Sequence, residues 1–347
     1  MTDFSFVGID IASVSFTAAI GKAKNEQWQI VAKPIEFTND VDGFTRYSHW
    51  LDENQVQPRK SIICMESTGV YGEALAYFLC SLNYRVVVEP PLKVKRAFHP
   101  VGHKNDSVDS CQIAEYAYRY QDELRVWLPK SQILEQIKVL LATREQLTVQ
   151  CTAHRNSIKA LKRKVVTTPL AEQVHEQSIQ QIQKHIKDID QEVNRLVDQD
   201  PDSRNLVTLL KSIPGVGPIL SAHLLVLIKG SNQTYSPKQM AAFIGICPYE
   251  HRSGSSIAKT ATSRHYGPEA LRRLLYLAAM SVRIHQPSFR LYFLRKSEQG
   301  KPRKVILNNI ANKLVKIICA VVRSQTPYIQ NYHSINPMYL QNTLTRS

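Results

Sequence analysis

The sequence predicts a fold of the α/β plus α class: a mixed sheet with helices, then a long helical hairpin, then a mainly helical C-terminal part. Three observations predict it. Apolar β-type runs alternate with helical spacing over residues 1–128, and apolar residues then recur every three or four positions over residues 129–199. Helical segments separated by glycine and proline fill residues 200–347. We therefore expect three domains with these boundaries.

The first part of the chain begins with three β-type runs, FSFVGIDIA, SFTAAIGKA and QIVAKPIEF, before any helical pattern appears. Short breaks separate them, so we expect an antiparallel meander. Helical stretches over residues 42–55 and 71–83 then alternate with the buried strands SIICME and YRVVVEP. A third helix follows the stretch KNDSVDS. This order is typical of a mixed sheet that is covered by helices.

The middle part has the apolar spacing of two packed helices, with a break at TTP (167–169). The apolar positions are Ile137, Leu140, Leu147, Cys151, Ile158, Leu161 and Val165 in the first arm, and Ile182, Ile186, Ile189, Val193 and Leu196 in the second. Arg144 and His154 lie at intervening seam positions. We expect an antiparallel hairpin of roughly 50 Å per arm, at about 1.5 Å per residue. Its first arm ends in a basic stretch with Lys162, Arg163 and Lys164, which suits either a solvated helix face or a nucleic-acid contact.

The C-terminal part contains LLKSIPGVGPILSAHLL, in which Gly215 and Gly217 separate two helical segments. This pattern is similar to a helix-hairpin-helix, whose free backbone N–H groups hold a phosphate, although a plain rigid corner also explains it. The segment from residue 295 to residue 323 is rich in Lys and Arg, including Arg303 and Lys304. Contacts with a nucleic-acid backbone are the use we expect for these cations.

Composition narrows the class of protein. The chain has 44 Lys and Arg against 29 Asp and Glu, a net charge of +15, which favours a polyanionic partner such as DNA or RNA. The six cysteines form no CxxC pair, so neither a zinc site nor a disulfide framework is expected. The N-terminus lacks a basic leader region, and the longest apolar run is short and interrupted by His223. We therefore expect a cytoplasmic protein with no membrane span.

Four carboxylates carry the candidate chemistry. Asp10 lies inside an apolar strand, Glu66 ends another, and Asp106 and Asp109 fall in the first turn of a helix. The simpler interpretation is that Asp106 and Asp109 cap that helix and complement its dipole. Strand ends and the start of a following helix meet at one edge of a sheet, however, so all four acids are candidates for one Mg²⁺-binding cluster. Two metal ions held in this way are a common device for breaking phosphodiester bonds.

Six motifs appear in the order and approximate spacing of the DEDD-type insertion-sequence transposases: GIDIA, MESTG, KNDSVD, SIPGVG, AAFIGICP and RSGSS. From about Phe4 to Val322 the chain resembles this family, which includes the Piv pilin-gene invertase and the bridge-RNA-guided recombinases. Six motifs together are far more specific than any one of them. The resemblance implies a RuvC-like, ribonuclease-H-type first domain, a coiled-coil hairpin and a C-terminal transposase domain that carries a serine nucleophile.

The resemblance also implies residue roles. The family's acidic tetrad falls on Asp10, Glu66, Asp106 and Asp109, which would bind Mg²⁺, two ions for which Mn²⁺ would substitute. The nucleophilic serine falls on Ser253, the first serine of RSGSS, although spacing alone does not separate it from Ser255 or Ser256. Arg252, which precedes the serine, departs from relatives with an acid there. It would either hold the scissile phosphate or alter how the serine is deprotonated.

The partners that the resemblance implies are double-stranded donor and target DNA and a non-coding bridge RNA. A homodimer that assembles to a tetramer is expected, because exchange of two duplexes needs four strand cuts. Other functions fit parts of the sequence. They are a RuvC-like junction nuclease that uses water instead of Ser253, a DNA invertase that acts without RNA, an actin-like sugar kinase, and a non-catalytic binding module. The kinase is disfavoured, because DIASVS lacks the glycine that lets the backbone approach a phosphate.

Overall fold

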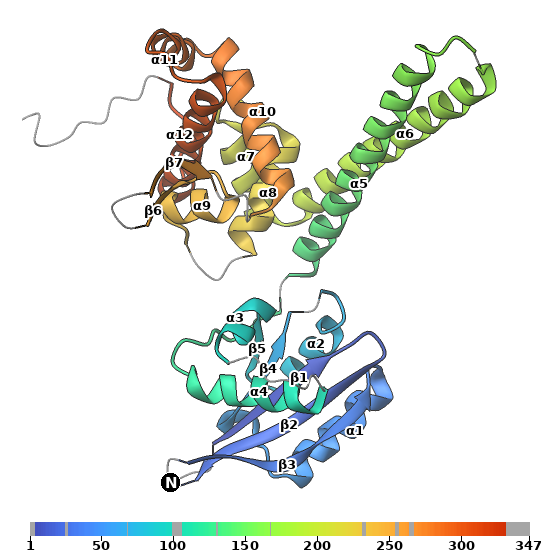
Figure 1. The fold of residues 1–347 in the computed structure, drawn as a ribbon, viewed down its shortest axis with the longest axis vertical. Coiled ribbons are helices and arrows are strands. Elements are labelled where there is room, and N and C mark those ends of the chain that lie inside the picture. The colour runs from blue at the N-terminus through green and yellow to red at the C-terminus, as the bar shows by residue number, and fades with distance from the viewer. Residues whose placement is uncertain are drawn as a thin grey trace, which may run out of the picture. The chain divides into compact units, whose positions relative to one another are not determined.

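The computed structural model describes residues 4–24, 27–67, 69–98, 106–129, 131–166, 168–230, 234–253, 257–263 and 267–330. The chain forms two compact units, Met1–Pro129 and Lys130–Ser347. Each unit is described by itself, and Figure 1 labels the elements of both.

The first unit is built on a five-stranded sheet with the order β3-β2-β1-β4-β5. The strands are β1 (Ser5–Ile11), β2 (Ser15–Lys24), β3 (Gln27–Thr38), β4 (Ser61–Glu66) and β5 (Val86–Glu89). The first three strands pair antiparallel, as the meander predicts, while β4 pairs parallel with β1 and β5 pairs parallel with β4. The prediction of a mixed α/β sheet is therefore confirmed.

Helices cover both faces of this sheet. The helices α1 (Val41–Glu53) and α2 (Glu73–Ser81) share a core with one face, while α3 (Pro91–Arg96) and α4 (Asp106–Arg119) pack on the other. Successive strand residues point to opposite faces, so Ile63 and Met65 join the first core and Ile62 and Cys64 the second. Burial on both faces explains why β4 reads as an unbroken apolar run.

The second unit begins with a hairpin of two long helices, α5 (Gln132–Leu161) and α6 (Pro169–Gln199). Pro169 is the first residue of α6, where its missing N–H costs nothing, so the break at TTP is where the sequence places it. The seam positions pair across the hairpin. Arg144 Nε lies 2.6 Å from Asp190 Oδ1, and the Nδ1 atoms of His154 and His175 lie 2.8 Å apart.

The rest of the second unit is mainly helical. Its helices are α7 (Pro201–Lys211), α8 (Pro218–Lys229), α9 (Pro237–Ile244), α10 (Glu269–His285), α11 (Pro287–Glu298) and α12 (Arg303–Ser324). Between α9 and α10 lies an antiparallel strand pair, β6 (Pro248–Ser253) and β7 (Ile257–Ser263). The sequence predicts only helical segments in residues 200–347, so this strand pair is an addition to the predicted fold.

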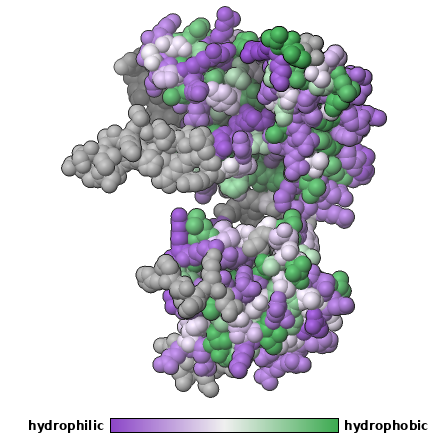
Figure 2. Space-filling model, turned by 45° about the vertical axis from the view of Figure 1, so that its right-hand side comes forward, coloured by the Kyte–Doolittle hydropathy of each residue, from purple (hydrophilic) through white to green (hydrophobic). Residues whose placement is uncertain are grey.

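In the described part of the chain, α12 alone is long and apolar enough to cross a membrane. Half of its apolar stretch is buried inside the second unit, where Ile306, Ile310, Leu314 and Ile318 belong to the core. Its apolar character is thus that of a core helix. Figure 2 shows hydrophobic residues interspersed among hydrophilic ones on the face that it draws.

Candidate active site

The candidate site begins with a close crossing of α4 over β1. A Cβ atom on Gly8 would overlap the Ser110 carbonyl oxygen and the Ala114 amide nitrogen, so helix and strand touch through their backbones. Two residues earlier, the Phe6 ring lies 5.4 Å from that of Tyr118. The start of β1 therefore meets the end of α4, and the end of β1 meets the start of α4.

Asp10 lies two residues beyond Gly8, on the same face of β1, and so comes next to the first turn of α4. Its side chain is half-buried, and burial raises the pKa of Asp10 above its ordinary value of 3.8. The negative charges of Asp109 and Asp106 raise this pKa further, while Lys95 of α3 opposes them. The structure thus brings three of the four predicted acids into electrostatic contact.

Glu66, the fourth predicted acid, is the last residue of β4. The parallel register pairs Ile9 with Met65, so the next residues, Asp10 and Glu66, end adjacent strands at the same edge. Strand alternation puts Glu66 on the face of Cys64, which is the face that α4 covers. Burial raises the pKa of the Cys64 thiol, with Glu89 and Glu66 as further causes. All four acids therefore share one face and one edge of the sheet.

A fifth acid, Glu89, lies beside them and was missed in the sequence. It ends β5, where its Cα pairs with that of Glu66, and it is buried. Lys93 of α3 compensates its charge through an ion pair of 3.1 Å. The signal was available, because VVVE ends with an acid just as IICME does, and both strands lie in the parallel part of the sheet.

The acids are near one another without being gathered at one point. Among the residues that the structure describes, no group of three or more His, Cys, Asp or Glu side chains is arranged closely enough to hold a metal ion. The chemistry of the donor set nevertheless fits Mg²⁺, which prefers carboxylate oxygens. Burial is the largest cause of the raised pKa of Asp10, and the negative charges of Asp109 and Asp106 add to it; a bound cation would relieve this repulsion.

The predicted nucleophile lies in the other unit. Ser253 is the last residue of β6, and its Cα pairs with that of Ile257, while Arg252 pairs with Ala258. The alternative serines, Ser255 and Ser256, lie outside the described residues, as do the first two residues of KNDSVDS. The residues of β6 and β7 show no alternation of apolar and polar side chains, so no sequence pattern predicts these strands.

The two predicted phosphate-binding glycines differ in their surroundings. Gly215 has φ +80°, and a Cβ there would lie 2.7 Å from Val282 Cγ1 and 3.1 Å from the Ala278 carbonyl oxygen of α10. Its lack of a side chain thus serves internal packing. Gly217 is the N-cap of α8 and has open space where a Cβ would be. Only Gly217 lies where a ligand has room to approach.

The remaining predicted nucleic-acid contacts are at helix ends. Lys162, Arg163 and Lys164 follow the last residue of α5 and are exposed. Arg303 and Lys304 are the exposed first residues of α12. No acid lies in the first turn of α12 and no side chain caps it, so positive side chains add to the positive end of the helix dipole.

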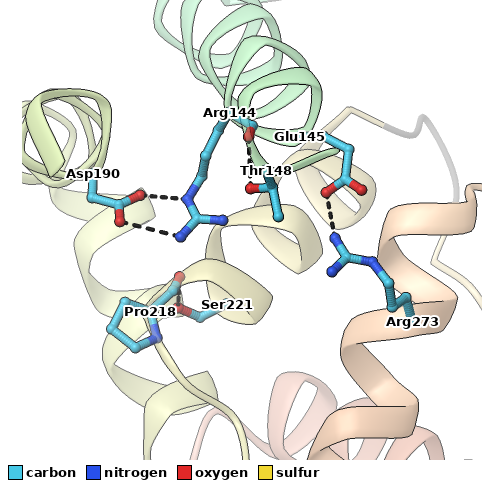
Figure 3. A network of polar contacts seen from close by, with 7 residues as sticks. All are labelled: Arg144, Glu145, Thr148, Asp190, Pro218, Ser221 and Arg273. Atoms are coloured by element: carbon cyan, nitrogen blue, oxygen red, sulfur yellow. Dashed lines mark hydrogen bonds and ion pairs between the residues drawn. The ribbon is translucent and has the colours of Figure 1, made fainter. Parts of the chain in front are cut away.

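A polar network joins the hairpin to the helices that follow it. Arg144 reaches from α5 to Asp190 of α6, while its neighbour Glu145 points to the other side and forms an ion pair with Arg273 of α10 (Figure 3). His223 of α8 is close to both arginines: burial, Arg144 and Arg273 together lower its pKa to about 4. The first arm of the hairpin is thus joined to α10 by an ion pair, and His223 of α8 lies beside both arginines.

The fold and the site define a class: an α/β protein with acidic side chains collected at one edge of a mixed sheet, joined to a basic helical unit. Residues 7–165 match a family model described as Transposase, and residues 207–294 match one described as Transposase IS116/IS110/IS902 family. Together these matches cover more than half of the chain. The chain belongs to this family of transposases, and it is an enzyme that acts on DNA.

Individual relatives agree with this assignment. The pilin gene-inverting protein of Moraxella bovis is 28% identical over 332 residues, which are 95% of this chain and 99% of that protein. The pilin gene-inverting protein of Moraxella lacunata has the same identity and coverage. The insertion element IS110 uncharacterized 43.6 kDa protein of Streptomyces coelicolor is 26% identical over 151 residues, or 44% of this chain and 36% of that protein.

Proposed function

We propose that this transposase cuts and rejoins DNA strands with a Mg²⁺-binding acidic tetrad and a serine nucleophile. The observation that carries the proposal is the electrostatic contact of Asp10 with Asp106 and Asp109, at the edge where Glu66 ends β4. Helix capping explains Asp106 and Asp109 alone, but it leaves the half-buried Asp10 among like charges without a reason. A metal-binding role gives all four acids one purpose.

In this proposal Asp10, Glu66, Asp106 and Asp109 hold the metal in a RuvC-like domain. Bound Mg²⁺, two ions in the full site and replaceable by Mn²⁺, supplies charge stabilisation at the scissile phosphate and its leaving oxygen. The acids themselves position the cation, and the four like charges of the tetrad set the affinity of the site for it. Lys95, which opposes the raised pKa of Asp10, tempers this repulsion when no metal is bound.

Ser253 acts as the nucleophile. Its hydroxyl oxygen attacks the phosphorus, a serine–phosphate ester forms, and the DNA phosphodiester breaks to leave a free DNA hydroxyl. The serine proton passes to a general base, and the leaving DNA oxygen takes up a proton from a general acid; the described residues assign neither group. Attack by another DNA hydroxyl on the ester then rejoins the strands and releases Ser253. The bond energy is conserved, so rejoining needs no ATP.

Nucleic-acid contacts in the proposal come from the second unit. Arg252 precedes the nucleophile and binds the scissile phosphate. Gly217, at the open start of α8, offers backbone N–H groups to a phosphate, and Gly215 shapes the turn that presents them. The backbone of nucleic acid is also bound by five cations at helix ends, Lys162, Arg163, Lys164, Arg303 and Lys304.

Assembly and guidance complete the proposal. A bridge RNA selects the donor and target DNA, and protomers associate through the coiled-coil hairpin as a dimer that assembles to a tetramer. The arms of the hairpin, at 30 and 31 residues, are long enough for such contacts. DNA inversion without RNA is the second candidate, because the two relatives matched over nearly the whole chain are described as inverting a pilin gene. A junction nuclease that uses water instead of Ser253 is the third.

One assay separates these mechanisms. Labelled DNA that carries the ends of the mobile DNA element encoding the transposase is incubated with protein and Mg²⁺. The reaction is quenched in denaturant and resolved by gel. We expect a denaturant-stable protein–DNA adduct with wild-type protein, none with Ser253→Ala or Asp10→Asn, and a retained adduct with Ser255→Ala and Ser256→Ala. Cleavage that persists in Ser253→Ala would favour the nuclease instead. RNA that copurifies and matches the flanking DNA would support guidance, and full recombination by RNA-free protein would exclude it.

A further inference from the structure

The packed helices α11 and α12 carry an unusual excess of positive charge. Residues 287–324 contain nine Lys and Arg side chains and a single acid, Glu298. The ordinary use of surface cations is solubility, for which acids are normally interspersed. The 22 residues of α12 include no acid at all. This surface is therefore strongly positive whatever the charge of the rest of the chain.

Four of these cations are close together. Lys313 and Lys316 lie three residues apart on one face of α12 and are exposed, and Arg295 and Lys296 lie near the end of α11. Loss of hydration lowers the pKa of Lys313, and the charges of Arg295, Lys316 and Lys296 lower it further. The lysine thus feels three like charges from two helices. Such repulsion costs the fold free energy unless an anionic ligand offsets it.

An aromatic ring organises the cluster. Lys313 Nζ lies 3.9 Å from the centroid of the Tyr292 ring, and Arg295 Cζ lies 5.9 Å from the same centroid. Tyr292 is half-buried, so its position is fixed by packing between the helices. Contacts of this kind attract cations to the ring face. The ring therefore holds two positive side chains from different helices in one place.

We propose that this face, made of Tyr292, Arg295, Lys296, Lys313 and Lys316, binds the sugar–phosphate backbone of nucleic acid. It is separate from the residues of the proposed catalytic machinery and from Arg303 and Lys304 at the start of α12. The inference rests on the proposed function in one respect, that the anionic ligand of this enzyme is nucleic acid. Backbone binding carries no sequence preference, so the face adds affinity and orients the duplex or the RNA.

The test measures binding of a labelled DNA duplex and a labelled RNA of equal length over a range of salt concentrations. For Lys313→Gln/Lys316→Gln we expect the slope of log association constant against log salt concentration to be shallower by about 2. Binding should be roughly thirtyfold weaker at about 0.15 M salt. The matched control is Arg59→Gln/Lys60→Gln, which loses the same charge from exposed residues of the short 3-10 helix Pro58–Lys60, just before β4 in the first unit. It should retain both the slope and the affinity.

A second pair of variants tests the ring without changing charge. Tyr292→Phe keeps the face on which the cations lie and should bind as wild type does. Tyr292→Leu removes it and should bind several-fold more weakly, with circular dichroism and thermal unfolding reporting that both variants fold. Equal binding by the two Tyr292 variants, or equal binding by the lysine variant and its control on both DNA and RNA, would overturn the proposal.

The two arms of the binding test identify the ligand. A loss larger on the duplex assigns the face to DNA, and a loss larger on RNA assigns it to RNA; either supports the proposal. Asp10→Asn separates it from the proposed catalytic function, because this variant should bind like wild type while forming no covalent adduct. Adduct formation with unaffected binding by Lys313→Gln/Lys316→Gln would reject the face alone, and weakened binding without any wild-type adduct would reject the catalytic proposal alone.

Discussion

Gly8 of β1 lies directly against Ser110 of α4, so strand and helix approach with no side chain between them. This contact sets the distance from Asp10, two residues along the strand, to Asp106 and Asp109 at the start of the helix. The candidate site therefore depends on a residue that has no chemistry of its own.

Gly8→Ala should damage both stability and activity. The new methyl group would meet backbone atoms of α4, which cannot rotate away as a side chain does, so the helix must shift. We expect a loss of about 2–3 kcal/mol in the free energy of unfolding, at the upper end for overpacking, and a loss of DNA cleavage. Gly72→Ala is the matched control, because its Cβ would lie 3.3 Å from the flexible Met65 side chain. Normal activity in Gly8→Ala would show that the crossing does not position the acids.

Asp10→Asn should remove activity while stabilising the metal-free protein at neutral pH. The folded-state pKa of Asp10 is raised above 3.8, so the folded protein binds its proton more tightly than the unfolded chain does. The wild-type protein therefore loses stability as the pH rises from 3.8 through the folded-state pKa of Asp10. Below pH 3.8 Asp10→Asn should be no more stable than the wild type. Thermal unfolding with and without Mg²⁺ measures both effects. Mg²⁺ should raise the Tm of wild type and of the control Asp122→Asn, but an equal rise in Asp10→Asn would contradict the metal site.

His223 should make the second unit sensitive to acid. Burial beside Arg144 and Arg273 lowers its pKa from 6.5 to about 4, so the unfolded chain binds a proton more readily than the folded one. Stability should fall as pH falls from 6.5 toward 4, by up to about 3 kcal/mol. Replacing His223 with Gln should flatten this dependence in urea unfolding curves. His285→Gln, at an exposed position of α10, serves as the control and should leave the dependence intact.

Asp200 should stabilise the junction between α6 and α7. Its carboxylate accepts hydrogen bonds from Lys229 Nζ at 2.7 Å, from the Ser203 hydroxyl at 2.5 Å and from the Ser203 backbone N–H at 3.2 Å, and these contacts lower its pKa to about 2. Asp200→Ala should cost about 1 kcal/mol, as for other N-caps. Because the pKa is depressed, this stability is present above pH 3.8 and is lost as pH falls toward 2. Asp188→Ala, in the middle of α6, should cost less, and an equal cost would argue against the cap.

The sequence predicts the sheet well where burial decides the pattern. Residues 61–66 are apolar throughout because both faces of β4 are covered, and the three strands before it are close enough along the chain to pair as a meander. The six-residue helix α3 has too short a pattern to be seen. The strands β6 and β7 pair through polar residues, so their register depends on backbone hydrogen bonds that leave no apolar trace.

The candidate site is predictable in its residues and not in its geometry. Strand ends and helix starts indicate Asp10, Glu66, Asp106 and Asp109, but their approach depends on the antiparallel crossing of α4 over β1 at Gly8, which no local pattern encodes. Glu89 was missed although VVVE ends with an acid as IICME does. Its importance follows from the pairing of β5 with β4, which is a tertiary relationship.

The most direct test of the central claim is to identify the atom that joins the protein to DNA. Wild-type protein is trapped on DNA with Mg²⁺, digested with a protease and a nuclease, and the modified peptide is sequenced by mass spectrometry. We predict a nucleotide phosphate on Ser253, with no modified peptide from Asp10→Asn or from reactions without metal. A phosphate on Ser255, on Ser256 or on any other residue, or efficient strand joining with no modified peptide, would contradict a serine nucleophile at this position.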